Sequence, residues 1–123
     1  MHELSVCQAL ISQVNDIATQ HKAASVDTIY LLLGPLSGVE PTLLQSAFPI
    51  ASAKTVADKA KLVIHLAPVR IRCKSCLTES EVSSNRLICR ACGNWNNQLL
   101  SGDELVLERV ELSAIQTEES LTV

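Results

Sequence analysis

The sequence predicts an α+β fold, in which a compact metal-binding module is inserted into a small mixed α/β domain before its last strand. Two segments carry apolar residues at helical spacing, and three runs are rich in β-branched and apolar residues, as is typical of strands. Four cysteines in two Cys-x-x-Cys pairs lie between the second and third of these runs. The expected order is therefore helix, strand, helix, strand, metal-binding module and strand.

The first helix is expected over residues 4–18. Apolar side chains recur there at steps of three and four residues, so they would share one face of the helix while polar side chains cover the other. The first strand is expected at 26–33, an apolar and β-branched run that ends at Gly34-Pro35. The expected apolar face of the helix consists of Leu4, Cys7, Leu10, Ile11, Val14, Ile17 and Ala18.

A second helix is expected to begin near Thr42, because Pro41 suits the first position of a helix. Pro49 lies inside its apolar pattern and is expected to kink or end the helix near Phe48, since proline cannot donate a backbone hydrogen bond. A short polar helical piece is predicted to follow at 55–60.

The second strand is expected at 62–66. The third is expected at 104–112, where apolar and charged residues alternate, so one face of this strand would meet solvent. Between these strands, residues 70–100 hold short apolar pieces, turn residues and the paired cysteines. Residues 113–123 show no strong periodicity and are expected to fray.

Composition and charge argue against several classes of protein. The chain has 123 residues and is 47% hydrophobic, which suits one modest core and a small appended module. The longest apolar run, 29–33, is far too short to span a membrane, and the first residues lack a secretion signal, so we expect a cytoplasmic protein. A net charge of -3 and one residue each of Trp, Tyr and Phe argue against a general nucleic-acid or membrane surface.

The four paired cysteines predict a tetrathiolate metal site. Cys73 and Cys76 form the first pair and Cys89 and Cys92 the second, with 12 residues between the pairs. Zinc prefers four thiolates in a tetrahedron, and two such loops at the ends of hairpins are typical of a zinc ribbon or a rubredoxin-like pair of knuckles. A closed structural zinc site is the favoured interpretation; rubredoxin-like iron and a redox-active dithiol are the weaker alternatives.

The residues that follow the two pairs differ. Gly93 follows the second pair and can adopt the left-handed backbone conformation that such loops often require, whereas Leu77 follows the first pair and adopts it only at a cost. We therefore expect slight strain in the first loop.

Basic residues gather near the cysteines. Residues 70–100 contain five basic and two acidic residues, a net charge of +3, whereas the remainder contains five basic and eleven acidic residues, a net charge of -6. One zinc ion with four thiolates subtracts two charges from the module. The arginines are therefore expected to offset the zinc–thiolate centre or to meet an acidic partner.

His2 is the second unusual feature. The amine of Met1, the imidazole of His2 and one or two backbone amides can form chelate rings around one metal ion, and Glu3 adds a further amide and a carboxylate. Nitrogen donors in a plane suit Ni²⁺ or Cu²⁺ better than Zn²⁺, although a histidine near a terminus is by itself more often a solvated side chain. His21 and His65 have no companion at ligand spacing, and no set of nucleophile, base and orienting residue indicates an enzyme.

Taken together, these residues resemble the HypA/HybF family of nickel metallochaperones, which serve the maturation of nickel–iron hydrogenase. The resemblance covers residues 1 to about 112 in unbroken order. It rests on Met1-His2-Glu3-Leu4-Ser5 with Cys7 and Leu10, on Gly34-Pro35-Leu36-Ser37-Gly38-Val39-Glu40-Pro41, on the two cysteine pairs, and on Leu100-Ser101-Gly102.

The resemblance implies a nickel domain with a three-stranded sheet and two helices, and a separate zinc-ribbon domain. The expected nickel domain covers residues 1–69 and is completed by a strand at 101–112. The expected zinc ribbon covers 70–100, and a flexible tail covers 113–123.

The resemblance also implies the ligands and the partners. The nickel role falls on His2, with the amine of Met1 and neighbouring backbone nitrogens such as that of Glu3, and the zinc role falls on the four paired cysteines. The implied partners are the GTPase HypB and the hydrogenase large subunit, with urease maturation as a further setting in some organisms. Nickel would be transferred cargo and zinc a structural ion, in a protein that is not an enzyme.

Leu77, the segment 36–39 and Cys7 each have an expected role, and one alternative function stays open. Leu77 stands where the family commonly has glycine, and the segment 36–39 is interpreted as a structural turn. Cys7 matches a position that is often cysteine in the family, but its periodicity favours a place in the core. The alternative function is a regulatory zinc-ribbon protein that binds nucleic acid or an assembly factor, with the amino terminus incidental.

Overall fold

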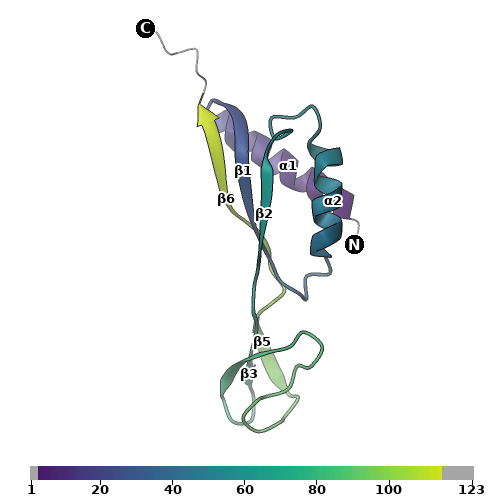
Figure 1. Ribbon diagram of the computed structural model, residues 1–123. Coiled ribbons are helices and arrows are strands. Elements are labelled where there is room, and N and C mark those ends of the chain that lie inside the picture. The colour runs from purple at the N-terminus through teal and green to yellow at the C-terminus, as the bar shows by residue number, and fades with distance from the viewer. Residues whose placement is uncertain (1–2, 115–123) are drawn as a thin grey trace. The chain divides into compact units, whose positions relative to one another are not determined.

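A computed structural model describes residues 3–114 and confirms the α+β class (Figure 1). Within these residues it contains two helices and two three-stranded sheets, with strand orders β2-β1-β6 and β4-β3-β5. Neither helix combines the length and the apolar character that a membrane-spanning segment needs. The elements in chain order are α1 (Glu3–Gln20), β1 (Ala23–Leu33), α2 (Pro41–Ser52), β2 (Lys61–Leu66), β3 (Val69–Cys73), β4 (Glu79–Val82), β5 (Asn97–Ser101) and β6 (Leu105–Ala114).

The chain divides into two compact units. The second unit consists of Leu32–Val39 and His65–Val106, and it therefore holds all four paired cysteines. The first unit consists of the remaining residues, including α1 and α2.

In the first unit, α1 buries most of the face that its sequence predicts. Five of the seven predicted residues are buried, whereas Ile17 is half-buried and Leu4, in the first turn of the helix, is 40% exposed. The helix packs against α2 and passes behind the strands β6, β1 and β2 in the view of Figure 1. The buried residues of α1 are Cys7, Leu10, Ile11, Val14 and Ala18.

The start of α2 is capped by a side chain that the sequence pattern did not single out. An Oε1 atom of Glu40 accepts a hydrogen bond from the backbone N–H of Leu43 at 3.1 Å, and Pro41 occupies the first helical position as predicted. Pro49 does not end the helix near Phe48, because α2 continues to Ser52, and the alternative that Pro49 kinks the helix stays a prediction. A proline has no backbone N–H, so the carbonyl group four residues earlier in the helix loses its hydrogen-bond donor. Pro49 is exposed in the last turn of α2, so water can bind this carbonyl group instead.

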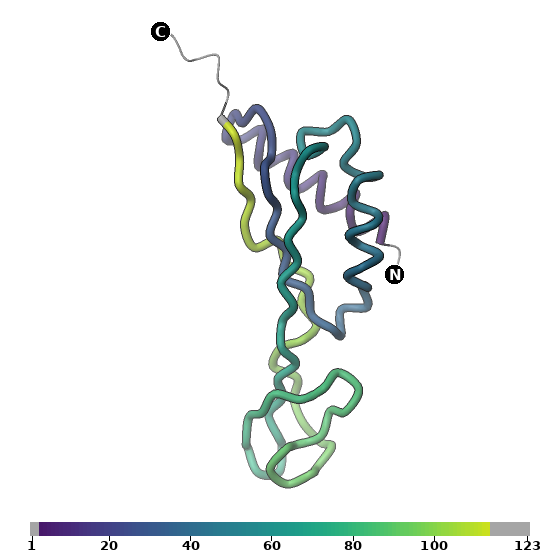
Figure 2. The backbone as a smooth tube through the Cα atoms, in the orientation of Figure 1, coloured from purple at the N-terminus to yellow at the C-terminus, as the bar shows by residue number. Residues whose placement is uncertain are grey.

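The helical piece predicted at 55–60 is also wrong, because this stretch is a series of turns between α2 and β2 (Figure 2). The hydroxyl of Thr55 donates to the carbonyl of Ser52 at 2.6 Å and accepts from the N–H of Ala57 at 3.1 Å. Such local side-chain bonds compete with the regular hydrogen bonds of a helix. The carbonyl of Val56 in turn accepts from the N–H of Val26, which holds the turns against β1.

The three predicted strands 26–33, 62–66 and 104–112 are all present and are joined in one sheet. The last of them, β6, runs on through Ser113 to Ala114, where fraying was expected; the Ser113 hydroxyl bonds the carboxylate of Asp27 at 2.7 Å. The rest of the predicted tail, 115–123, lies outside the described residues.

The second unit contains a small sheet built around β3. Val69, Ile71 and Cys73 are buried on one face of this strand, while Arg70 and Arg72 alternate with them. The strand pairs antiparallel with both β4 and β5. This arrangement places Cys73 at the end of the central strand, where the first cysteine loop begins.

Two glycines allow a close backbone approach in this unit. A Cβ atom at Gly34 would lie 2.1 Å from the carbonyl oxygen of Gly102, a distance that no side chain tolerates. The same carbonyl accepts a 2.7 Å hydrogen bond from the N–H of Leu36. The segment that follows β1 is thus held by backbone contacts that require glycine.

Candidate metal centres

The first cysteine loop wraps its backbone around a sulfur atom. The N–H groups of Ser75 and Cys76 each lie 3.4 Å from the Sγ atom of Cys73. The loop is closed by two backbone bonds, from Leu77 N–H to the carbonyl of Cys73 at 3.0 Å and from Cys73 N–H to the carbonyl of Thr78 at 2.9 Å. These N–H donors stabilise negative charge on the sulfur.

The second loop repeats this hydrogen-bonding pattern position by position. The N–H groups of Ala91 and Cys92 lie 3.4 Å and 3.5 Å from the Sγ atom of Cys89. Gly93 N–H bonds the carbonyl of Cys89 at 2.9 Å, and Cys89 N–H bonds the carbonyl of Asn94 at 2.9 Å. The two loops are therefore two copies of one local structure.

Both loops close through a residue in the left-handed region of the backbone. Leu77 has a φ of 64° and Gly93 has a φ of 77°. Glycine adopts this conformation without steric cost, whereas leucine does not. The asymmetry expected between the two loops is confirmed.

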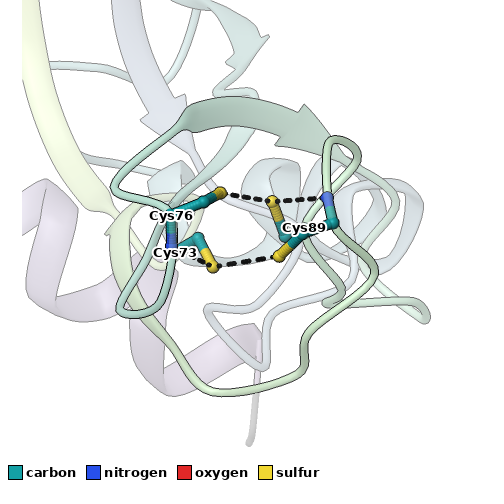
Figure 3. A group of neighbouring side chains, drawn as sticks. Cys73, Cys76 and Cys89 are labelled. Carbon is teal, nitrogen blue, oxygen red and sulfur yellow. Dashed lines mark hydrogen bonds between the residues drawn. The ribbon is translucent and has the colours of Figure 1, made fainter.

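The four sulfur atoms meet in one cluster (Figure 3). All four Sγ atoms lie within 4.8 Å of one another, and the shortest distances, 3.5 Å from Cys73 to Cys92 and 3.6 Å from Cys76 to Cys89, join one loop to the other. Sulfur atoms at about 2.3 Å from a tetrahedral zinc ion lie about 3.8 Å apart. The cluster therefore fits a tetrahedral thiolate-bound metal and is consistent with a zinc ribbon.

Two of these thiols, Cys76 and Cys92, have widely separated pKa values. Hydrogen bonds with the side chain and backbone of Thr78 lower the pKa of Cys76 to about 6. The N–H of Asn94 lowers the pKa of Cys92, but the neighbouring sulfur atoms and burial outweigh it and raise that pKa to about 12. Four thiolates thus coexist at neutral pH only if a cation offsets their charge.

Side chains and backbone also hold the two loops to each other. The side-chain amide of Asn94 donates to the hydroxyl of Ser75 at 2.7 Å, and the N–H of Lys74 donates to the carbonyl of Asn96 at 3.0 Å. Ser75, Asn94 and Asn96 carry no distinctive signal in the sequence, because Ser and Asn are also common in ordinary turns.

Of the predicted nickel ligands, the structure describes Glu3 alone, because Met1 and His2 lie outside the described residues. Glu3 begins α1, and its Oε2 atom accepts a 3.1 Å hydrogen bond from the N–H of Glu40. This bond joins the first turn of α1 to the residue that caps α2. The sequence did not predict it, since 37 positions separate the two glutamates.

Cys7 lies in the core, as its periodicity predicts. Its side chain is fully buried, and its Sγ atom lies 3.5 Å from the carbonyl of Leu44. Burial, together with the nearby carboxylate of Glu3, raises the pKa of this thiol. Within the described residues, the four paired cysteines are the only group of three or more His, Cys, Asp or Glu residues whose ligand atoms could share one metal ion.

Comparison with known protein families identifies a match over nearly the whole chain. The family described as "Hydrogenase/urease nickel incorporation, metallochaperone, hypA" matches residues 1–112. A Hydrogenase maturation factor HypA from Nitrosospira multiformis is 49% identical over 112 residues, which cover 91% of this chain and 97% of that protein. The same factor from Aquifex aeolicus is 39% identical over the same share of both chains.

Solved structures with a fold similar to that of this chain belong to the same family. The solution structure of the Ni metallochaperone HypA from Helicobacter pylori superposes with a TM-score of 0.68 at 26% identity, covering 94% of this chain and all of that one. A second solution structure of a HypA protein superposes with a TM-score of 0.70, also at 26% identity. The resemblance found in the sequence is confirmed, and the chain belongs to the HypA family of nickel metallochaperones and hydrogenase maturation factors.

Proposed function

We propose that this protein carries Ni(II) at its amino terminus and delivers it during the maturation of nickel–iron hydrogenase. The observation that carries the proposal is the family match over residues 1–112, in a sequence that places a histidine at position 2. The Helicobacter pylori relative is described as a Ni metallochaperone, and the curated relatives are hydrogenase maturation factors.

The proposed nickel site uses nitrogen donors from the first three residues. The amine of Met1, the imidazole of His2 and backbone nitrogens, including that of Glu3, would surround the ion in a near-planar arrangement that suits Ni²⁺. The Glu3 carboxylate accepts the N–H of Glu40, so we assign it the role of anchoring the start of α1. A site at the end of the chain can exchange its ion by stepwise ligand replacement, without unfolding a core.

The second proposed ion is a structural Zn(II) held by Cys73, Cys76, Cys89 and Cys92. Four thiolates fill a tetrahedral site and leave no position for a substrate, so this ion would stabilise the second unit and take no part in catalysis. The protein would act as a carrier and not as an enzyme. Its proposed partners are the GTPase HypB, the hydrogenase large subunit as acceptor, and in some settings the urease maturation proteins.

The nickel site is tested by titrating zinc-loaded protein with Ni(II) and following the ligand-field absorption. We expect one nickel ion per chain in the wild type, and at least about tenfold weaker binding with an altered spectrum in His2→Ala, because the variant loses one of the nitrogen donors. His21→Ala and His65→Ala are matched controls, since both histidines are exposed on the described surface. An unchanged affinity and spectrum in His2→Ala would remove the proposed site.

A further inference from the structure

Leu77 combines backbone strain with a freely exposed apolar side chain. Its φ of 64° lies in the left-handed region, and 71% of the residue is exposed to solvent. A leucine side chain makes this backbone conformation harder to adopt and, at this exposure, contributes little to the core. The loop itself therefore gives no reason for leucine at this position.

The equivalent position of the second loop shows what the fold prefers. Gly93 makes the same hydrogen bond, to Cys89, that Leu77 makes to Cys73, and glycine meets the conformation at no cost. Strained residues that the local structure does not require are characteristic of functional positions. We therefore look for a use of the Leu77 side chain outside this molecule.

Trp95 provides a second, independent observation on the adjoining loop. It is the only tryptophan of the chain and is 79% exposed. Its backbone is held in place, because its carbonyl accepts a 2.9 Å hydrogen bond from the side chain of Asn97 and its neighbours Asn94 and Asn96 bond Ser75 and Lys74 of the first loop. A large aromatic side chain on a loop that is already ordered loses little entropy on binding, which is the property of an interface hot spot.

The unit that holds these two apolar side chains also carries exposed positive charge. Lys74, Arg86 and Arg90 are exposed, and within the described part of the chain none of them lies within ion-pair distance of a carboxylate. Arg86 and Arg90 line a groove of about 540 Å³ beside the second loop, together with the apolar side chains of Val82 and Ile88. The charge complements carboxylates on a partner.

We propose that Leu77 and Trp95, together with the basic residues Lys74, Arg86 and Arg90 of the same unit, form a docking surface for the acceptor protein, which would present an apolar pocket bordered by carboxylates. This inference rests on the proposed function, since it assigns the acceptor a place on the carrier. The surface belongs to the second unit, whereas α1, with which the proposed nickel site is continuous, belongs to the first. Docking through the second unit leaves the nickel ligands free to exchange.

The first test compares the affinity of full-length, zinc-loaded variants for the precursor of the hydrogenase large subunit. We expect Leu77→Gly and Trp95→Ser each to bind at least tenfold more weakly than the wild type. The single variant Arg86→Glu should also bind more weakly than the wild type, and its loss of affinity should be greater at low salt than at high salt. Ile50→Ala is the matched control and should bind within twofold of the wild type, because Ile50 lies on α2 and is 70% exposed, almost as much as Leu77.

Leu77→Gly also separates docking from folding. Because glycine relieves the backbone strain, the variant should release zinc to a chelator no faster than the wild type, while its partner affinity falls. Nickel stoichiometry should be unchanged in every docking variant. A loss of affinity accompanied by faster zinc release would assign Leu77 to the fold and overturn the proposal.

The single tryptophan allows a test without substitution. Protein that carries 5-fluorotryptophan has one ¹⁹F resonance, from Trp95, and this resonance should shift or broaden when the acceptor precursor binds. An unshifted resonance in a complex detected independently by light scattering, unchanged affinity in Leu77→Gly, or no binding of the acceptor by the wild type would each overturn the docking surface. Self-association of the protein that disappears in Leu77→Gly would assign the surface to a second copy and overturn it as well. The His2→Ala nickel titration tests the carrier function independently of these outcomes.

Discussion

At the scale of single residues, cysteines of the same chemical type have opposite roles because their surroundings differ. Cys76 is exposed and bonds Thr78, which lowers its pKa to about 6, so its thiolate is available to a metal at neutral pH. Cys7 is buried among apolar side chains with a raised pKa, so it remains a protonated thiol at neutral pH. Cys73 and Cys89 are buried as well, so the feature that distinguishes Cys7 is that its sulfur lies outside the cluster formed by the four paired cysteines.

Cys7→Ala therefore tests a structural assignment. We expect the free energy of unfolding to fall by about 1–3 kcal/mol, because a buried side chain and its contact with the Leu44 carbonyl are lost. Nickel and zinc content, measured by elemental analysis of the same samples, should remain equal to the wild type. Loss of either metal from a variant that still folds would contradict the assignment of Cys7 to the core.

At the scale of elements, the periodicity of the sequence predicts structure where packing is regular. α1 and the three strands of the larger sheet follow their apolar patterns, since burial of one face decides their conformation. The errors at Pro49 and at 55–60 have a different cause, because solvent at an exposed helix end and local bonds of Thr55 are not visible in a hydrophobic pattern. The bond between Glu3 and Glu40 joins residues 37 positions apart, and neither residue indicates its partner.

The pKa values of Cys76 and Cys92 predict how the affinity of the cysteine cluster for zinc depends on pH. Zinc must displace any proton that a thiol holds, so affinity is expected to fall as the pH falls. With a pKa of about 12, Cys92 releases a proton to bind zinc throughout the neutral range, whereas Cys76, with a pKa of about 6, is already a thiolate above that pH. A plot of log affinity against pH should therefore be steeper, by about one unit of slope, below pH 6 than above it.

Competition with a chelator of known affinity between pH 5 and pH 8 measures this slope. Thr78→Ala is the informative variant, because loss of the Thr78 hydroxyl raises the pKa of Cys76 and should move the change of slope to higher pH. A straight line in the wild type, or the same break in Thr78→Ala, would show that Thr78 does not set the ionisation of this ligand.

At the scale of the whole molecule, the two proposed metal sites belong to different units of the chain. The four cysteines lie in the second unit, and α1, which begins at Glu3, lies in the first. The spacing of the cysteines is enough to predict a tetrathiolate cluster, because two Cys-x-x-Cys loops have few other uses in one small module. The docking surface could not be predicted in the same way, since the exposure of Leu77 and Trp95 depends on the fold of the loops.

The central claim, that nickel binds at the amino terminus, is tested most directly by native mass spectrometry of two forms of the protein. One form has a free Met1 amine, and the other carries a short Gly-Ser extension before Met1, which removes that amine from the chelate. We expect one zinc ion and one nickel ion on the first form, and one zinc ion without tightly bound nickel on the extended form. An extended protein that takes up one nickel ion with the affinity of the free form would contradict the proposed nickel site.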